Sequence, residues 1–490
     1  MAGIGVTLNK IFSRKTITTH ILGSAYGVAI TVAPMLLIIA TILLMGQVLG
    51  LVQEPYAKRE LFSCITLYMF VFSLIAAAPT NAVFSRYLSD VIFEEDYAAI
   101  MPCFYIGLFL QTVISLCMGV PFCIWIYLQG QVSLLYIVTG YCGFMALILV
   151  FYSMIYLSIC KDYKRIALYF LAGAIFTFTL SLILVHFCSL EVTYSMLLSL
   201  TIGLCFIGSI LLATIKSYFR EYNNKYERVL VYFKQYYKLI VTNSMYIFGL
   251  YIHNFVFWNS SLGVRVAGGF LNAPPYDMAT FLGMATSITS SVIFLTRVEM
   301  HFHVRYRAFS EAVIGGRGAD IKSAKERMFA QLSAELMNLV RIQFIISVVV
   351  YLFCVVILPG FGFSGLVMQI YPCLAAGYFI LFIMYAAIIF LYYYNDLTGS
   401  MLTSLTFFFV TWIGSRYART LPEIWYGLGL VIGSTAAWAV AYTRLRWVER
   451  NLDRHIFCQG QLIPRGRGKM PPQLVYESKR QAIGSSAKEG

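Results

Sequence analysis

One apolar stretch of the chain carries polar side chains where a membrane span would be expected to be uniformly apolar. The stretch NSMYIFGLYIHNFVFWNSS, residues 243–261, carries Asn243, His253 and Asn254. At about 100° per residue, Asn254 falls about 20° from Asn243 around a helix, with Tyr246 near about 300° and His253 near about 280°. Because a polar group in hydrocarbon is costly unless it is solvated, this face is predicted to meet water or another helix. His253 could serve as a neutral hydrogen-bonding group or as a protonation switch.

A second polar stripe occurs in the first apolar segment. Measured from Ser24, the residues His20, Thr31 and Pro34 fall between about 280° and about 340° on a helical wheel. Pro34 removes a backbone hydrogen bond and is expected to bend the helix. The two stripes, with the adjoining Trp258, predict a hydrated substrate path lined by His20, Ser24, Thr31, Pro34, Asn243, Tyr246, His253, Asn254 and Trp258. The alternative is that these groups hydrogen-bond between packed helices, at about 1 kcal/mol each.

Aromatic composition is a second indication of the ligand class. The chain holds 35 tyrosines and 6 tryptophans. Aromatic faces suit the apolar C–H patches of sugar rings, but Tyr and Trp are also enriched at membrane–water interfaces. Composition alone leaves both uses open.

The elements that hold these residues are predicted to be membrane-spanning helices. The chain of 490 residues is 60% hydrophobic and 12% charged, with mean hydropathy +0.76, whereas soluble domains are about 25% charged. About 20 apolar residues cross the roughly 30 Å of hydrocarbon in a bilayer. Such windows occur at 20–49, 61–85, 101–128, 132–159, 166–188, 195–215, 239–260, 277–297, 342–365, 368–394, 401–415 and 424–443. We expect an all-α integral membrane protein with twelve transmembrane helices in two six-helix lobes around a central cavity.

The distribution of positive charge predicts the orientation of the chain. Most of the 36 Lys and Arg residues fall on one side if the N-terminus is cytoplasmic, as the positive-inside rule requires. The exceptions are Lys58, Arg59, Arg265, Arg416 and Arg419. Both termini are therefore predicted to be cytoplasmic, in a multi-pass protein of the cytoplasmic (inner) membrane. The net charge of +14 is explained by orientation, and no recognition motif accompanies it that would indicate nucleic acid.

The expected organisation alternates lobes with basic cytoplasmic segments. It comprises an amphipathic N-terminus (1–19), a first lobe (20–215), a basic inter-lobe segment (216–238), a second lobe (239–443) that includes a long cytoplasmic segment (298–341), and a basic, disordered tail (444–490). Within 298–341, Met328, Leu332, Leu336 and Val340 recur at the spacing of an amphipathic helix.

These basic segments are predicted to contact a partner protein or the membrane surface. The candidate residues are Arg220, Lys225, Arg228, Lys234, Arg305, Arg307 and Lys325. Position 326 belongs to the same set, although the chain has Glu326 there and the basic residue beside it is Arg327.

The sequence lacks recognisable motifs for catalysis, cofactors and metals. GGRGADIKS and RGRGKM lack the spacing of a phosphate-binding loop. The 11 cysteines have no zinc-site spacing and are expected to pack as small apolar residues. The nearest acidic cluster, Glu94, Glu95 and Asp96, lies in a short loop and is expected to be a solvated face. We therefore expect no catalytic residue, no cofactor and no metal site.

Three short motifs resemble one family of membrane proteins. MAGIG opens the chain, SRYLSDVIFEED follows the second window, and LDRHIF followed by CQG comes after the last window. With these motifs the chain resembles the PelG family, the membrane component of the Pel exopolysaccharide system, within the multidrug/oligosaccharidyl-lipid/polysaccharide exporter superfamily. The resemblance covers roughly residues 1–460. It implies a two-lobed exporter of an N-acetylgalactosamine-rich polymer, beside a cytosolic glycosyltransferase and a membrane partner that senses cyclic di-GMP.

The predicted function is export of this polysaccharide for the biofilm matrix, in contact with membrane lipid and coupled to its synthesis. Several relatives in the superfamily use a carboxylate in the first lobe for ion coupling, but the first six windows contain no Asp or Glu, and Asp277 and Asp396 sit at helix ends in the second half. Two alternatives remain. A flippase for lipid-linked oligosaccharide would share the fold, and a membrane scaffold for a polysaccharide synthase would not transport.

Overall fold

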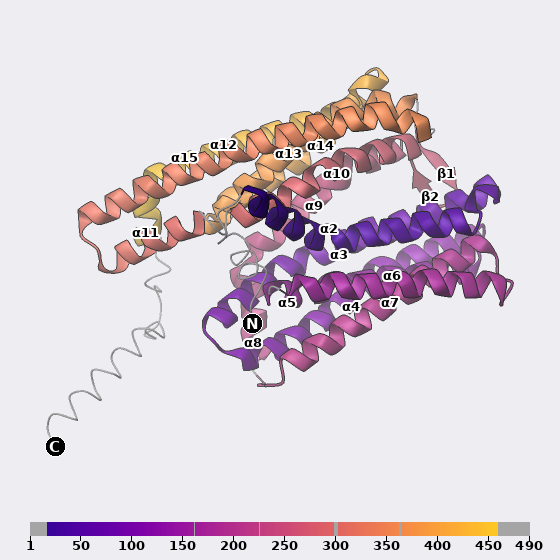
Figure 1. The fold of residues 1–490 in the computed structure, drawn as a ribbon, viewed down its shortest axis with the longest axis horizontal. Helices are drawn as coiled ribbons and strands as arrows, with labels where there is room; N and C mark the ends of the chain where they lie inside the picture. Colours follow the sequence, from indigo (N-terminus) through magenta and orange to yellow (C-terminus); the bar gives the residue numbers. More distant parts are fainter. Residues whose placement is uncertain (1–16, 161, 225, 298–301, 362–364, 459–490) are drawn as a thin grey trace.

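The computed structural model describes residues 17–160, 162–224, 226–297, 302–361 and 365–458, and most of them are helical. The long helices run roughly along the longest axis of the molecule (Figure 1). They are α2 (Ile17–Val48), α3 (Tyr56–Phe93), α4 (Ile100–Gln129), α5 (Leu134–Ile159), α6 (Tyr163–His186), α7 (Val192–Tyr218), α9 (Tyr237–Trp258), α10 (Pro274–Arg297), α12 (Gly318–Ile357), α13 (Leu366–Tyr393), α14 (Leu397–Ala418) and α15 (Leu428–Cys458). The shorter elements are α8 (Tyr226–Gln235), α11 (His303–Gly315), β1 (Val264–Val266), β2 (Phe270–Asn272) and the 3-10 turns η1 (Leu51–Gln53), η2 (Tyr97–Ala99), η4 (Leu358–Phe361) and η5 (Glu423–Trp425).

Helices α2 to α7 pack mainly with one another and are called here the first helix group. In this group α5 packs against α3, α4 and α7, while α6 packs against α2 and α7. Their facing sides are apolar, and Phe84, Phe104 and Leu147 are fully buried between them. The turns follow from local chemistry. Gly130 ends α4 in a left-handed conformation with φ 67°, which glycine adopts without strain, and the Asp162 carboxylate accepts a hydrogen bond from the Arg165 N–H at the start of α6.

Helices α9, α10 and α12 to α15 form the second helix group. Helix α14 packs against α9 and α15, and α13 packs against α10, α12 and α15. Tyr371, Leu374 and Phe407 are buried in its core. Helix α8 connects the two groups, and its apolar side, with Val229 fully buried, lies against the first group.

Ten of the described helices are long and apolar enough to cross a membrane. The mostly helical membrane fold predicted from the sequence is therefore confirmed, and the chain is a multi-pass membrane protein. Helices α2 and α10 coincide with the two remaining windows, 20–49 and 277–297. The count of twelve spans stays a prediction.

Two helices extend beyond the predicted windows. Helix α12 is one continuous helix of 40 residues, so the amphipathic stretch near Met328 and the following apolar window are a single element. Helix α15 continues to Cys458 with a kink at Asn451, where φ is -114° and ψ is 19°, whereas a disordered tail was expected from residue 444. The physical reason is packing, because Val448 and Leu452 are fully buried against α12 and α13. The remainder of the predicted tail, 459–490, lies outside the described residues.

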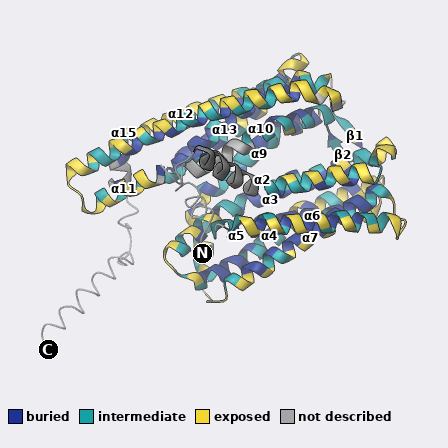
Figure 2. Ribbon diagram, viewed as in Figure 1, coloured by how far each residue is buried: buried dark blue, intermediate teal, exposed yellow. Residues whose placement is uncertain are grey.

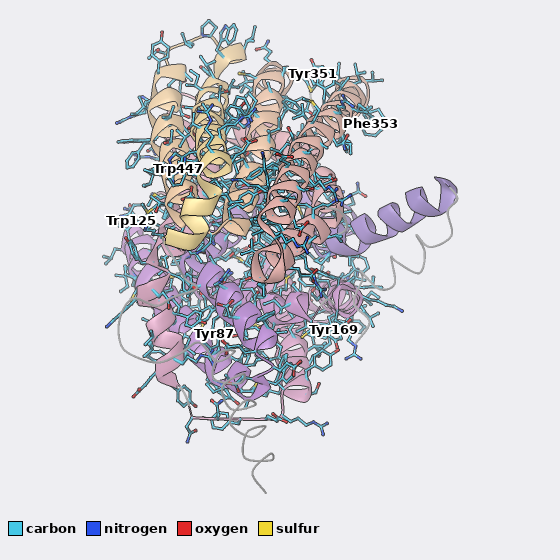
Figure 3. The ribbon with its side chains drawn as sticks, turned by 90° about the vertical axis from the view of Figure 1, so that its left-hand side faces the viewer. Tyr87, Trp125, Tyr169, Tyr351, Phe353 and Trp447 are labelled. Atoms are coloured by element: carbon cyan, nitrogen blue, oxygen red, sulfur yellow. The ribbon has the colours of Figure 1, made fainter. Side chains whose placement is uncertain are left out.

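The side of α12 that faces away from the bundle is apolar, as expected for contact with lipid. Phe344, Ile345, Val349 and Phe353 are all exposed on it. Figure 2 shows exposed residues along α12 and α15 at the edge of the molecule, and Figure 3 shows Phe353 at that edge, pointing outward.

A β-hairpin follows α9, which the sequence analysis did not predict. Strands β1 and β2 pair antiparallel, with Val266 opposite Phe270. The three intervening residues include Ala267 and Gly268 with positive φ, which is typical of tight hairpin turns. The hairpin lies at the end of the molecule opposite α11 (Figure 1). We call these the hairpin end and the α11 end.

Candidate functional site

The predicted polar stripe of α9 faces neighbouring helices. His253 is fully buried, and its Nδ1 is 2.9 Å from the hydroxyl of Tyr276 on α10. The His253 ring also packs edge-on against Tyr378 of α13. Its Nε2 is buried and has no hydrogen-bond partner among the described residues, which leaves one polar atom available to a proton, water or ligand group.

Asn254 and Trp258 converge on one carboxylate, that of Asp277 in the first turn of α10. Asn254 Nδ2 donates to Asp277 Oδ1 over 2.7 Å, and Trp258 Nε1 donates to both carboxylate oxygens at 2.9 and 3.0 Å. The backbone N–H of Ala273 adds a fourth bond, 3.0 Å to Oδ2. The carboxylate is thus held entirely by neutral donors. It ties α9, the hairpin and α10 together at the hairpin end.

Asn243 and Tyr246 lie nearer the α11 end of α9. Asn243 Nδ2 donates to the backbone carbonyl of Ala78 on α3 over 2.6 Å, so this residue bridges the two helix groups. The Tyr246 ring stacks on Tyr385 with centroids 5.2 Å apart and lies beside Phe407. The stripe therefore includes one contact between the groups and several contacts within the second group.

The residues predicted in the first stripe are on α2. Pro34 lies inside this helix and is buried. The side chains of His20, Ser24 and Thr31 lie outside the described residues. Helix α2 contacts α10 of the second group. The shared role of both stripes in a substrate path stays a prediction.

The two helix groups meet along a seam formed by α3 with α9 and by α2 with α10. At the hairpin end the seam is aromatic. The rings of Tyr68 and Trp258 stack with centroids 5.2 Å apart and an interplanar angle of 10°, and Phe72 stacks on Phe255 at 5.7 Å and 9°. Glu60 Oε2 accepts a hydrogen bond from Asn272 Nδ2 over 3.1 Å. The seam is closed at this end.

An apolar cavity of about 260 Å³ lies directly behind the seam, inside the first helix group. It is bounded by α3, α4, α5 and the hairpin, and its walls include Tyr68, Phe72, Phe122, Tyr141 and Phe270. The hydroxyl of Tyr141 is buried without a partner among the described residues. Tyr68 is therefore part of both the cavity wall and the seam.

The predicted basic contact residues differ in their surroundings. Arg228 on α8 pairs with Glu94 at 2.5 Å and Asp96 at 3.4 Å, so this pair of carboxylates is engaged rather than free. Burial acts to lower the pKa of Arg228, but the hydrogen bond and charge of Glu94 outweigh it and raise that pKa. The ion pairs of Arg228 hold α8 against the α11 end of the first helix group.

The other members of the set are more accessible. Arg220, Lys234, Arg305 and Arg307 are exposed, as is Glu326, and Lys325 is half-buried. Lys325 and Glu326 line an open groove with Glu449 between α12 and α15. Lys225 lies outside the described residues.

Asp396, noted in the sequence only as a helix end, forms a buried ion pair. Its carboxylate is 2% exposed and accepts two bonds from Arg444 of α15, at 2.8 and 3.0 Å. It also caps α14 by accepting the Gly399 N–H. The guanidinium of Arg444 lies 4.5 Å from the ring centre of Trp447.

Sequence reasoning missed Tyr68 and the contacts of Asp277. Tyr68 bonds a residue 203 positions away, and no local pattern indicates such a contact. The hairpin did carry a signal, since VRV and FLN flank AGG, an arrangement typical of a tight turn between strands. Among the described residues, no group of three His, Cys, Asp or Glu could hold a metal ion.

The chain matches known proteins at the levels of family and fold. The PelG family profile, with the description "exopolysaccharide Exporter (EPS-E)", matches residues 1–457. No curated protein gives a significant match.

Solved structures with similar folds are transporters. A MATE protein in complex with MaL6 has a TM-score of 0.58 at 14% identity, covering 88% of this chain and 97% of that one. An inward-facing multidrug resistance MATE family transporter of the MOP superfamily has a TM-score of 0.54 at 14% identity, covering 81% and 91%. A MOP superfamily transporter from Pyrococcus furiosus has a TM-score of 0.55 at 16% identity, covering 87% and 96%.

Proposed function

The chain belongs to the PelG family of exopolysaccharide exporters, and on this basis we propose that it exports an N-acetylgalactosamine-rich polymer across the cytoplasmic membrane to the biofilm matrix. The family match over residues 1–457 carries the proposal. The MATE-like fold supports it, because that fold belongs to transporters rather than enzymes.

The proposed topology has twelve spans with both chain ends in the cytoplasm. Helices α2 and α10 join the ten span-capable helices. The basic residues then gather at the α11 end, which becomes the cytoplasmic side. The hairpin end, with Arg265, Arg416 and Arg419, becomes the outer side.

The proposed path runs along the seam between the helix groups. Asn243 bridges the groups through Ala78. His253 faces Tyr276 and Tyr378 inside the second group, and its buried Nε2 has no partner in the described part of the chain. Such an atom is costly to leave unmet, and a hydroxyl or amide of a saccharide would meet it once the surrounding helices move apart. The stripe residues of α2 would complete the path from the other group.

The cytoplasmic surface is the proposed docking site for a glycosyltransferase that feeds the polymer into the path. Exposed Arg305 and Arg307 on α11, with Arg220 and Lys234, supply its positive charge. The membrane partner that senses cyclic di-GMP is carried over from the family resemblance. Without a nucleotide-binding motif in the chain, polymer elongation is the proposed driving force.

The polymer is proposed to cross in its acetylated, neutral form. Each free amine leaving an inside-negative cell would cost about 2.3 kcal/mol per 100 mV. Deacetylation would therefore follow export.

Cells that lack this chain but keep the synthase test the proposal. We expect acetylated polymer to accumulate inside them and to disappear from the medium, and an intact gene to restore secretion. Lipid-linked short units inside the cell would favour a flippase instead. Loss of synthesis with no trapped polymer would favour a scaffold, and mostly deacetylated polymer inside would contradict the proposed order of steps.

A further inference from the structure

The stacked rings of Tyr68 and Trp258 are the strongest feature that the proposed function leaves unused. They lie on different helix groups, α3 and α9, and face each other across the seam with centroids 5.2 Å apart. Phe122 and Phe270 pack around Tyr68, and Phe255 packs on Trp258. The contact is thus the centre of an aromatic cluster that joins the two groups at the hairpin end.

Both rings are held by their polar edges, which leaves their faces for stacking. The Tyr68 hydroxyl donates to the Leu271 carbonyl and accepts the Leu271 N–H, both at 3.0 Å. The Trp258 Nε1 donates to the Asp277 carboxylate. Trp258 is held by Asp277 of its own helix group, so its ring keeps its orientation when Tyr68 moves away and its face is preorganised.

The β-hairpin covers the contact between Tyr68 and Trp258 at the end of the molecule. It belongs to the second group in sequence, but Val266 and Phe270 are buried in the core of the first group. Glu60 of α3 binds Asn272 at its end. The hydrogen bonds between the Tyr68 hydroxyl and Leu271 therefore link the two groups. The groups cannot separate at this end unless these bonds break.

We propose that Tyr68 and Trp258 form an outer gate that becomes a clamp for a sugar ring when the helix groups separate. The inference rests on the proposed function, which supplies the saccharide. A pyranose ring presents C–H groups on its faces, and these suit the negative face of an aromatic ring. In the closed state the two ring faces stack on each other, so the gate stays closed when no substrate is bound.

Two native cysteines allow the gate to be tested without any polymer. Cys64 is fully buried on α3, one helical turn from Tyr68, and Cys103 is fully buried in the core between α3, α4 and α5, away from the seam. A membrane-impermeant maleimide should reach Cys64 only when the gate opens, while Cys103 reports global unfolding. Labelling at each site is quantified by peptide mass spectrometry in right-side-out and inverted membrane vesicles.

Two variants of Tyr68 distinguish the contribution of its hydroxyl from that of its ring face. Tyr68→Phe keeps the face but loses the hydroxyl, and we expect Cys64 labelling in right-side-out vesicles to rise about fivefold. Tyr68→Ala loses both, so labelling should rise and export of polymer by cells should fall about fivefold or more. Phe176→Ala is the matched control, because it removes a stacked pair with Phe206 that lies between α6 and α7. It should change neither measurement.

Several results would overturn the proposal. These are unchanged Cys64 labelling in both Tyr68 variants, a parallel rise at Cys103, a rise confined to inverted vesicles, or undiminished export by Tyr68→Ala. If no variant and not even the unmodified chain exports polymer, the proposed function fails, while Cys64 labelling still decides whether the gate exists.

Discussion

The buried carboxylates show how differently two acidic residues can be accommodated at the scale of single residues. Asp396 is neutralised by Arg444 across 2.8 Å, whereas Asp277 is held by neutral N–H donors from Asn254, Trp258 and Ala273. Both appeared in the sequence only as acids at helix ends. Their partners come from other helices, so burial and pairing could not be predicted from local patterns.

The Asp396–Arg444 pair should be important for stability. Arg444→Ala leaves a carboxylate buried without its cation, which costs about 3–5 kcal/mol. We expect a clear fall in the thermal unfolding temperature of the detergent-purified protein. Arg307→Ala is the control, because its pair with Glu311 is exposed on both sides and such pairs contribute about 0–1 kcal/mol. Equal unfolding temperatures for the two variants would contradict this assignment.

Asp277 gives a second prediction at this scale. Asp277→Asn places an amide among donors that need an acceptor, so at least one buried N–H loses its partner, at about 1–3 kcal/mol. The thermal unfolding temperature should fall, whereas Asp320→Asn, at the exposed start of α12, should leave it nearly unchanged. The account of this site would be wrong if both variants unfolded alike.

At the scale of elements, hydropathy predicted the positions of the long helices because each must bury or expose a continuous apolar surface in lipid. It did not predict how far α12 and α15 extend beyond the predicted windows, since their extra turns are stabilised by tertiary packing of Phe329, Val448 and Leu452. The hairpin was missed because its strands are three residues long, too short for a hydropathy window.

Close helix packing gives a prediction that needs no functional assay. A Cβ at Gly203 of α7 would overlap the Thr177 side chain of α6, whereas one at Gly208 would meet Val150 at 3.6 Å, an ordinary contact. Gly203→Ala should therefore destabilise the protein by about 1–3 kcal/mol. Gly208→Ala should change stability by no more than about 1 kcal/mol, on the stabilising side. Thermal unfolding of both variants decides this, and the reverse order would refute the packing of α6 on α7.

At the scale of the whole molecule, the division into two helix groups and their seam determine what the protein can do. The sequence predicts two halves from the basic segment near residues 216–238, and this division into two six-helix lobes stays a prediction. What it could not predict is where the groups touch, because residues such as Tyr68 and Trp258 meet only through the fold. His253 and Asn254 of the predicted α9 stripe bond Tyr276 and Asp277, contacts that no local pattern indicates, and the role of the stripe in a substrate path stays a prediction.

Native cysteines also test the proposed topology. Cys188 is exposed after α6, and Cys160 is partly exposed at the end of α5. With the α11 end in the cytoplasm, an impermeant maleimide should label Cys188 in right-side-out vesicles and Cys160 in inverted ones. The opposite pattern would invert the assigned orientation of the chain.

The central claim is that this chain carries a growing saccharide across a membrane. Its most direct test is reconstitution of the chain with the cognate glycosyltransferase in sealed vesicles, with the synthase on the outer face and labelled sugar nucleotide supplied there. The account predicts that polymer accumulates inside vesicles that contain the chain and is protected from added glycosidase. Polymer that stays outside and glycosidase-sensitive, whether or not the chain is present, would contradict it.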